Sequence, residues 1–178
     1  MITRLCSIHD SQIEKSIHPH IIEKLAKIMT LESGKPLQES LGEISYGASF
    51  LDFYAAEAIR SDCAGGGKIL PSPFSSIDGS PRGKIFATKE AVGICAMITP
   101  WNFPLAMITR KVGPALAAGC TTIVKPSEYT PLTAIAAHNL AVRAGVPDGV
   151  FELMYVHKVS FFFSSHTRKM LNVSLFIF

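Results

Sequence analysis

The chain has 178 residues, of which 48% are hydrophobic and 17% are charged. These proportions suit one domain with a substantial core and exclude a chain that is disordered over most of its length. The formal net charge is only +3 and no basic stripe is present, so we expect no nucleic-acid partner. No run of about 18 apolar residues occurs, so we expect no membrane-spanning segment.

The four cysteines indicate an intracellular protein. Cys6, Cys63, Cys95 and Cys120 form no CxxC pair and have no zinc-ligand spacing, so we expect reduced thiols and no metal site. Cys95 and Cys120 lie in apolar segments, where a small buried thiol is typical. The first residues, MITRLCSIHD, lack the apolar core of a secretory signal. The sequence does not decide between the cytoplasm and the mitochondrion.

Two amphipathic helices are predicted after residues 1–20, which show no clear pattern. In the first, Ile22, Leu25 and Met29 recur at helical spacing, and Gly34 and Pro36 mark its end. The apolar face of the second consists of Leu41, Ile44, Ala48, Leu51, Tyr54 and Ala55. Its carboxylates are Glu39, Glu43, Asp52 and Glu57. We interpret these carboxylates as a solvated face rather than an acid–base pair, because charges on an amphipathic helix usually face water.

Residues 69–93 change character and predict two strands joined by a loop. Asp78 and Gly79 give a turn signal, and an extended stretch follows over residues 84–88. Three glycines at 65–67 precede this segment. Because no GK[ST] follows them, we interpret them as a linker rather than a phosphate-binding loop.

The segment from residue 91 to residue 156 predicts a β-α-β-α-β unit. The apolar run AVGICAMIT and the β-branched run CTTIVK indicate strands, and a third strand is expected near 150–156. The helix between the first two strands ends at Gly119, and a second helix begins with Thr130 as N-cap and Pro131 at its first position. Short connections and buried strands indicate a doubly wound parallel sheet, so the fold class is α/β.

Two unusual turns, TPWNFP and KPSE, follow the first two of these strands. Ligands of doubly wound sheets bind beyond the carboxyl ends of the strands, so both turns are expected at one edge. In the second turn, Glu128 can accept hydrogen bonds from ribose hydroxyls and Lys125 can donate to a ribose or a phosphate. An ordinary surface turn with a Lys–Glu pair is the alternative, and the chain has no GxGxxG fingerprint.

Residues 100–134, PWNFPLAMITRKVGPALAAGCTTIVKPSEYTPLTA, resemble the cofactor-domain motif of the NAD(P)-dependent aldehyde dehydrogenase superfamily. The upstream segments LESGKPLQESLGEI and FLDFYAAEAIR support this resemblance. Within the superfamily, NFPLAMITRKVGPALAAGC and KPSE are most similar to succinate-semialdehyde dehydrogenases. The resemblance covers residues 21–154. It implies a partial Rossmann-like domain that binds NAD or NADP, in an enzyme that oxidises a small aldehyde.

The resemblance also implies roles for individual residues. Asn102 matches the asparagine whose side-chain amide helps to form the oxyanion hole. The residues implied to line the nicotinamide side of the cofactor cleft are Ile98, Thr99, Pro100 and Trp101. The turn implied to hold the adenosine ribose contains Lys125, Pro126, Ser127 and Glu128. Arg110 matches an arginine near the cofactor and the substrate carboxylate, which a guanidinium fork fits; the alternative is a helix-surface arginine beside Lys111.

The same resemblance implies assembly and an incomplete catalytic apparatus. Residues 69–93 resemble the family's hairpin that packs against another subunit, which implies a homodimer or homotetramer. Family catalysis needs a cysteine nucleophile and a glutamate that activates water, and neither motif occurs here, nor does the glycine-rich turn that meets the cofactor diphosphate. We therefore expect the chain alone to be catalytically incomplete. The alternative function is a non-catalytic nucleotide-binding or subunit-interaction module.

Residues 155–178 depart from the family pattern after Met154. A Phe-rich run and an apolar end are compatible with a short membrane-active or partner-binding tail, although neither apolar piece reaches spanning length. We favour a segment unrelated to the family, because it carries aggregation-prone β-formers.

Overall fold

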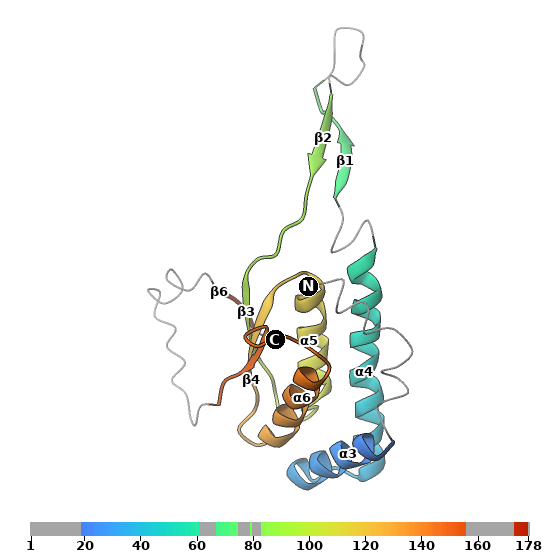
Figure 1. Cartoon of the computed structure of the whole chain (residues 1–178), viewed down its shortest axis with the longest axis vertical. Coiled ribbons are helices and arrows are strands. Elements are labelled where there is room, and N and C mark those ends of the chain that lie inside the picture. The colour runs from blue at the N-terminus through green and yellow to red at the C-terminus, as the bar shows by residue number, and fades with distance from the viewer. Residues whose placement is uncertain (1–18, 61–66, 75–78, 80–82, 156–172, 178) are drawn as a thin grey trace.

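The computed structural model describes residues 19–60, 67–74, 79, 83–155 and 173–177. Its helices are α3 (Pro19–Ser33), α4 (Leu37–Ile59), α5 (Ala106–Ala117) and α6 (Pro131–Arg143). Its strands are β1 (Lys68–Pro71), β2 (Lys84–Ala87), β3 (Ile94–Ile98), β4 (Thr121–Lys125), β5 (Phe151–Leu153) and β6 (Val173–Ile177). The α/β class and the elements predicted within residues 21–154 are confirmed, with shifted ends (Figure 1).

The larger sheet is parallel and has the strand order β5-β4-β3-β6. The chain therefore moves outward from β3 through β4 to β5 and then returns to the other side of β3. A reversal of this kind is the switch point at which doubly wound sheets bind their ligands. The predicted β-α-β-α-β unit supplies three of these strands, whereas β6 was not predicted. It lies in the segment assigned to the tail and pairs along the edge of β3 that β4 leaves open.

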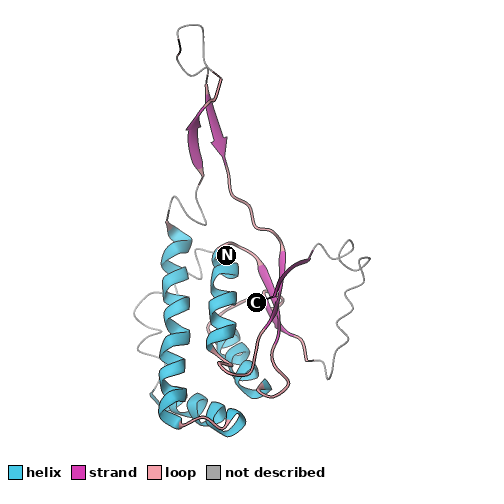
Figure 2. Ribbon diagram, turned by 180° about the vertical axis from the view of Figure 1, so that it is seen from behind, coloured by secondary structure: helices cyan, strands magenta, loops and turns pink. Residues whose placement is uncertain are grey.

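Helices cover one face of this sheet. Parallel crossovers are almost always right-handed, so two successive crossovers in the same direction place their helices on the same face. Figure 2 shows the helices on one side of the strands. The buried cluster between α5, α6 and the sheet contains Cys95, Met97, Ile108, Val112, Leu116, Cys120, Val124, Ala134, Val150 and Phe151. A second cluster joins α3 and α4 to the start of α5 and contains Leu25, Ala26, Met29, Ile44 and Leu105.

The buried face of α4 differs from the predicted one. The structure buries Ser40, Glu43, Ile44, Gly47 and Ala58. Leu51 is 44% exposed and Ala48 is exposed, although both were assigned to the apolar face. The reason is a close approach to α5, because a Cβ on Gly47 would lie only 3.3 Å from Oγ1 of Thr109. The face of α4 that packs against α5 therefore includes Gly47 beside the apolar Ile44.

The two short strands β1 and β2 form an antiparallel hairpin that extends away from the rest of the molecule (Figure 1). The two predicted strands are confirmed, and Gly79 has a positive φ of 80°, whereas Asp78 lies outside the described residues. The large apolar side chains exposed here are Ile69, Leu70, Phe74, Ile85 and Phe86. Among the described residues, no helix is both long and apolar enough to cross a bilayer.

Candidate functional site

The turns that follow β3 and β4 start side by side. The two strands pair in parallel, and Ile98 lies opposite Lys125 at the end of the register. One residue further, the amide of Thr99 donates to the carbonyl oxygen of Lys125 over 3.1 Å. Thr99 is buried, so the chain turns towards solvent only after this residue. The expectation that TPWNFP and KPSE meet at one edge is confirmed.

The first turn presents most of its side chains to solvent. Pro100 and Asn102 are exposed, and Trp101 and Phe103 expose 56% and 42% of their surfaces, whereas Pro104 is buried. Trp101, Asn102 and Phe103 line an open cavity of about 630 Å³ together with residues of α3, α4 and the loop between them. The buried proline therefore anchors a turn whose amide remains accessible to a ligand.

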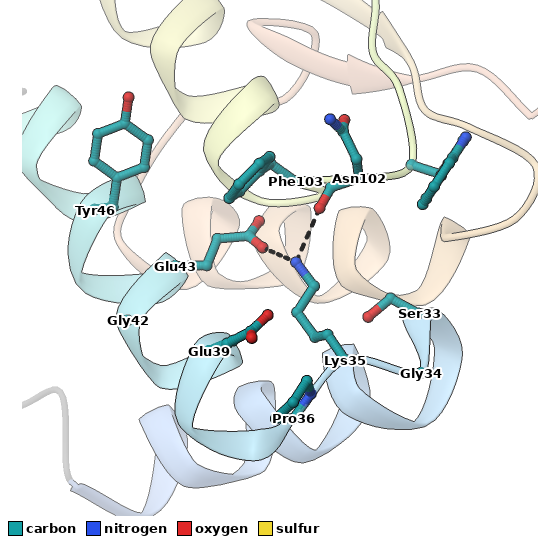
Figure 3. Close-up of a pocket in the computed structure, with 11 residues that line it drawn as sticks. Ser33, Gly34, Lys35, Pro36, Glu39, Gly42, Glu43, Tyr46, Asn102 and Phe103 are labelled. Carbon is teal, nitrogen blue, oxygen red and sulfur yellow. Dashed lines mark hydrogen bonds and ion pairs between the residues drawn. The ribbon is translucent and has the colours of Figure 1, made fainter.

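A buried ion pair lies beneath this turn. Nζ of Lys35, in the loop between α3 and α4, donates to Oε2 of Glu43 and to the carbonyl oxygen of Asn102, the latter over 3.0 Å. The same ammonium lies 5.0 Å from the centre of the Phe103 ring. Figure 3 shows the side-chain amide of Asn102 pointing away from Lys35. The lysine therefore binds the main chain of Asn102 and not its side-chain amide.

Glu43 is a tertiary cap for α5. Its side chain is 1% exposed, and its Oε1 accepts the amides of Leu105 over 2.8 Å and Ala106 over 3.2 Å. The interpretation of Glu43 as part of a solvated face is therefore wrong. A carboxylate tolerates this burial because it is paired with Lys35 and receives two donors from the positive end of a helix. Glu39 and Asp52 are exposed, as expected.

The start of α6 is capped in a similar way. Thr130 occupies the predicted N-cap position, but its side chain makes no capping hydrogen bond, and its buried Oγ1 has no partner among the described residues. The carboxylate of Glu32, at the end of α3, instead accepts the amides of Leu132 over 2.7 Å and Thr133 over 2.9 Å. It also accepts the hydroxyl of Thr133. The helix begins where the sequence predicted, with a different capping group.

The second turn holds the residues assigned to the ribose. Nζ of Lys125 lies 3.4 Å from the carbonyl oxygen of Pro126, and Oγ of Ser127 accepts the amide of Tyr129 over 3.2 Å. Glu128 is exposed. The structure therefore places a lysine and a carboxylate in one turn at the carboxyl end of β4, next to the start of the Asn102 turn.

Arg110 and Lys111 are neighbours on α5 with different surroundings. Arg110 is exposed, with its guanidinium carbon 5.6 Å from the centre of the Phe50 ring and a contact of 3.9 Å to the sulfur of Met107. Nζ of Lys111 donates to the carbonyl oxygen of Ile98 over 2.7 Å. Burial lowers the pKa of Lys111, and the neighbouring charge of Arg110 lowers it further. Lys111 thus fixes the last residue of β3, whereas Arg110 lies against α4.

The buried thiol of Cys95 is not an activated nucleophile. Cys95 and Cys120 are both free and buried, which confirms the expectation for these two residues. Burial raises the pKa of Cys95 to about 11, and the thiol of Cys120 contributes to the increase. At neutral pH Cys95 is therefore protonated, and only a thiolate attacks efficiently. Cys6 and Cys63 lie outside the described residues.

Glu32, Lys35, Glu43 and Lys111 form contacts at this edge that the sequence did not predict. Glu32 and Lys35 lie in the quoted segment LESGKP, which supported the family resemblance without suggesting a role for either. The signal in the sequence was the position of Glu32 and Lys35 where the helix ends at Gly34 and Pro36, because charged side chains at a helix end can contact a neighbouring helix or turn.

Comparison with known proteins decides the family. The model of the aldehyde dehydrogenase family matches residues 12–168. The chain belongs to the aldehyde dehydrogenase family. This match extends beyond both ends of the 21–154 segment on which the resemblance was first based, and it includes part of the segment assigned to the tail.

Named aldehyde dehydrogenases similar to this chain include two succinate-semialdehyde dehydrogenases. The mitochondrial enzyme of Arabidopsis thaliana is 54% identical over 132 residues, which are 74% of this chain and 23% of that protein. The NADP⁺ enzyme of Escherichia coli is 49% identical and covers 74% of this chain and 25% of its own length. The chain thus spans about a quarter of the length of these relatives.

A solved aldehyde dehydrogenase shares the fold. The crystal structure of betaine aldehyde dehydrogenase from Staphylococcus aureus in complex with NAD⁺ is 33% identical and has a TM-score of 0.71. The similarity covers 88% of this chain and 28% of that one. Aldehyde dehydrogenases similar to this chain therefore include proteins named for NADP⁺ and a protein crystallised with NAD⁺.

Proposed function

We propose that this chain supplies the cofactor-binding part of an NAD(P)-dependent aldehyde dehydrogenase that oxidises succinate semialdehyde to the carboxylic acid. The observation that supports this most is the meeting of the Asn102 turn and the 125–128 turn at the carboxyl ends of adjacent strands. The choice of substrate rests on the named relatives, two of which are succinate-semialdehyde dehydrogenases. Residues 21–154 form the domain, and β6 (Val173–Ile177) joins its sheet.

The donor set of the second turn fits the ribose of a dinucleotide. The exposed carboxylate of Glu128 can accept two hydroxyls, and the ammonium of Lys125 can donate to one of them. Both helix N-termini of the unit are already occupied by the carboxylates of Glu43 and Glu32, which repel a further anion. The cofactor diphosphate therefore needs groups other than these two helix ends. We expect weak binding by the isolated chain.

Asn102 is the proposed transition-state donor. When a thiolate attacks an aldehyde carbonyl, negative charge develops on the carbonyl oxygen, and an amide N–H that points at it stabilises the transition state by roughly 3–4 kcal/mol. The exposed amide of Asn102, in a turn anchored by the buried Pro104, suits this role. Bound NAD or NADP supplies the hydride acceptor. Ile98, Thr99, Pro100 and Trp101 are proposed to line the nicotinamide side.

Arg110 is proposed to bind the far carboxylate of the substrate. Its guanidinium is exposed and is held over the ring of Phe50, which restricts its orientation. A planar guanidinium recognises a carboxylate with two parallel hydrogen bonds, which lysine cannot reproduce. If this role is correct, Arg110→Lys in the full-length enzyme raises KM for succinate semialdehyde far more than for an uncharged aldehyde.

Titration of the purified chain with NAD⁺ tests the ribose site. We expect weak, saturable binding that is lost in Lys125→Ala and in Glu128→Ala. Lys27→Ala is the matched control, because Lys27 forms an exposed ion pair with Glu23 on α3. Equal NAD⁺ binding by the parent chain and all three variants would contradict the assignment of Lys125 and Glu128 to the ribose site. The chain alone should not reduce NAD⁺ in the presence of succinate semialdehyde, and turnover at a rate typical of the family would refute its incompleteness.

A second candidate function is a subunit-interaction module. The observation that favours it is the projecting hairpin, whose apolar side chains, including Ile69 and Phe86, are exposed. Exposed apolar patches of this kind commonly mark protein interfaces. We propose that β1 and β2 pair with a second copy to give a homodimer or homotetramer. Sedimentation of the chain should show an oligomer that Phe86→Ser dissociates, whereas a monomeric parent chain would exclude this function.

A further inference from the structure

We infer that Lys35 and Glu43 are positioning residues that fix the direction in which Asn102 presents its amide. This inference gives the proposed oxyanion role of Asn102 a structural cause and rests on that role for its catalytic meaning. The contacts themselves involve the main chain of the turn. They can therefore be tested without substrate, without cofactor and without the rest of the enzyme.

Side chains of α5 and α4 hold the two ends of the turn. At its beginning, Lys111 binds the carbonyl oxygen of Ile98 over 2.7 Å, which fixes the last residue of β3. At its end, Oε1 of Glu43 binds the amides of Leu105 and Ala106 over 2.8 and 3.2 Å. Between these ends, the residues from Pro100 to Phe103 are exposed, whereas Thr99 and Pro104 are buried. Backbone hydrogen bonds hold the amide of Thr99 and the carbonyl oxygen of Phe103, so the conformation at Trp101 and Asn102 depends largely on the side chains that bind the turn.

Lys35 makes the remaining connection. Its ammonium bridges Oε2 of Glu43 and the carbonyl oxygen of Asn102, so one buried carboxylate is linked to the turn on both sides of Phe103. Because a peptide unit is planar, holding the carbonyl of Asn102 restricts its ψ angle and hence the direction of its side chain. The lysine is 13% exposed and the carboxylate 1% exposed, so water competes poorly for the ion pair, whereas the contact with the carbonyl oxygen of Asn102 is exposed.

Lys35 and Glu43 act as a unit, and both lie on the side of the turn opposite to the side-chain amide of Asn102 (Figure 3). Figure 3 shows Lys35 between Glu43 and the main chain of Asn102, with the side-chain amide on the opposite side of the turn. Removing either charge leaves the other buried without its partner, so each single variant should disturb the turn. Lys35→Arg keeps a cation with several donors and should restore the contacts in part.

Amide hydrogen exchange of the full chain, measured by NMR, tests the inference. In Glu43→Leu, exchange at Leu105 and Ala106 should rise at least about tenfold, because both amides lose a charged acceptor. In Lys35→Met it should rise less, because Glu43 keeps both amides but loses its buried counterion. Exchange in β4 should stay unchanged. The fluorescence anisotropy of Trp101, the single tryptophan of the chain, should fall in both variants and recover in Lys35→Arg.

Lys27→Met is the matched control, since it removes an exposed lysine and its exposed ion pair from α3. A uniform acceleration across α5 and β4 would show a general loss of stability and would overturn the positioning role. Wild-type exchange at Leu105 in Lys35→Met would overturn it as well. Both results are independent of NAD⁺ binding, so failure of this inference is distinguishable from failure of the proposed function.

Discussion

Replacement of Glu32 should destabilise the chain through a helix 100 residues away. Its carboxylate accepts the amides of Leu132 and Thr133, the second and third residues of α6, over 2.7 and 2.9 Å. Loss of an N-cap costs about 1 kcal/mol within a range of about 0.5–2 kcal/mol, and loss of a negative charge at a helix N-terminus adds about 0.3–1 kcal/mol. We expect Glu32→Ala to lower the free energy of unfolding by about 1–3 kcal/mol.

Urea unfolding of the full chain, followed by circular dichroism, measures this cost. Glu32→Gln keeps an acceptor but loses the charge, so it should cost about 1 kcal/mol and lie between the parent and Glu32→Ala. Glu23→Ala is the control on the same helix, because its ion pair with Lys27 is exposed and should contribute less than about 1 kcal/mol. If Glu32→Ala costs no more than Glu23→Ala, and exchange of the Thr133 amide does not change, the capping role is refuted.

Three further predictions follow from single contacts. Thr130→Val should leave the free energy of unfolding unchanged or raise it by about 1 kcal/mol, because the buried hydroxyl has no partner among the described residues. A decrease of more than about 1 kcal/mol in the free energy of unfolding would contradict this prediction. The parent chain should lose stability as the pH rises from about 9 to about 11, because the thiol of Cys95 ionises first in the unfolded state. Urea midpoints measured against pH should fall less steeply in Cys95→Ala, and equal slopes in the two proteins would argue against the raised pKa of Cys95. Gly67→Ala should open the base of the hairpin, since its Cβ would lie 2.5 Å from the carbonyl oxygen of Ala87; unchanged amide exchange in β1 and β2 would show that the hairpin tolerates it.

The sequence predicts those parts of the fold that depend on local pattern. Period-3.6 apolar spacing located the helices, and glycine marked their ends: Gly119 and Gly145 have φ angles of 81° and 90° after α5 and α6. The shared edge of the Asn102 and Lys125 turns was also predictable, because the carboxyl ends of neighbouring parallel strands coincide. The roles of individual residues in these turns remain predictions.

Contacts between distant segments were not predictable from the same pattern. Glu43 has the spacing of a solvent-facing residue on α4, yet it binds an amide 62 residues later in the chain. The strand β6 pairs with β3 in a register that joins Ile94 to Val173, and nothing in the local sequence specifies that partner. Thr130 has the residue type and position of an N-cap, yet Glu32 supplies the hydrogen bonds. In each case a tertiary partner replaced the group that local chemistry favours.

The two tertiary caps also explain why α3 and α4 belong to the site. A helix N-terminus at the end of a parallel strand attracts anions when it is free, and this unit has two helix N-termini at the edge where doubly wound sheets bind ligands. Glu43 and Glu32 neutralise both ends from a pair of helices that precede the sheet in the chain. An anionic ligand at this edge would therefore need cationic side chains, and the Asn102 turn is held, through Lys35, by the same carboxylate that caps α5. The main chain of the Asn102 turn and the start of α6 therefore depend on the N-terminal helices and the loop between them for their placement.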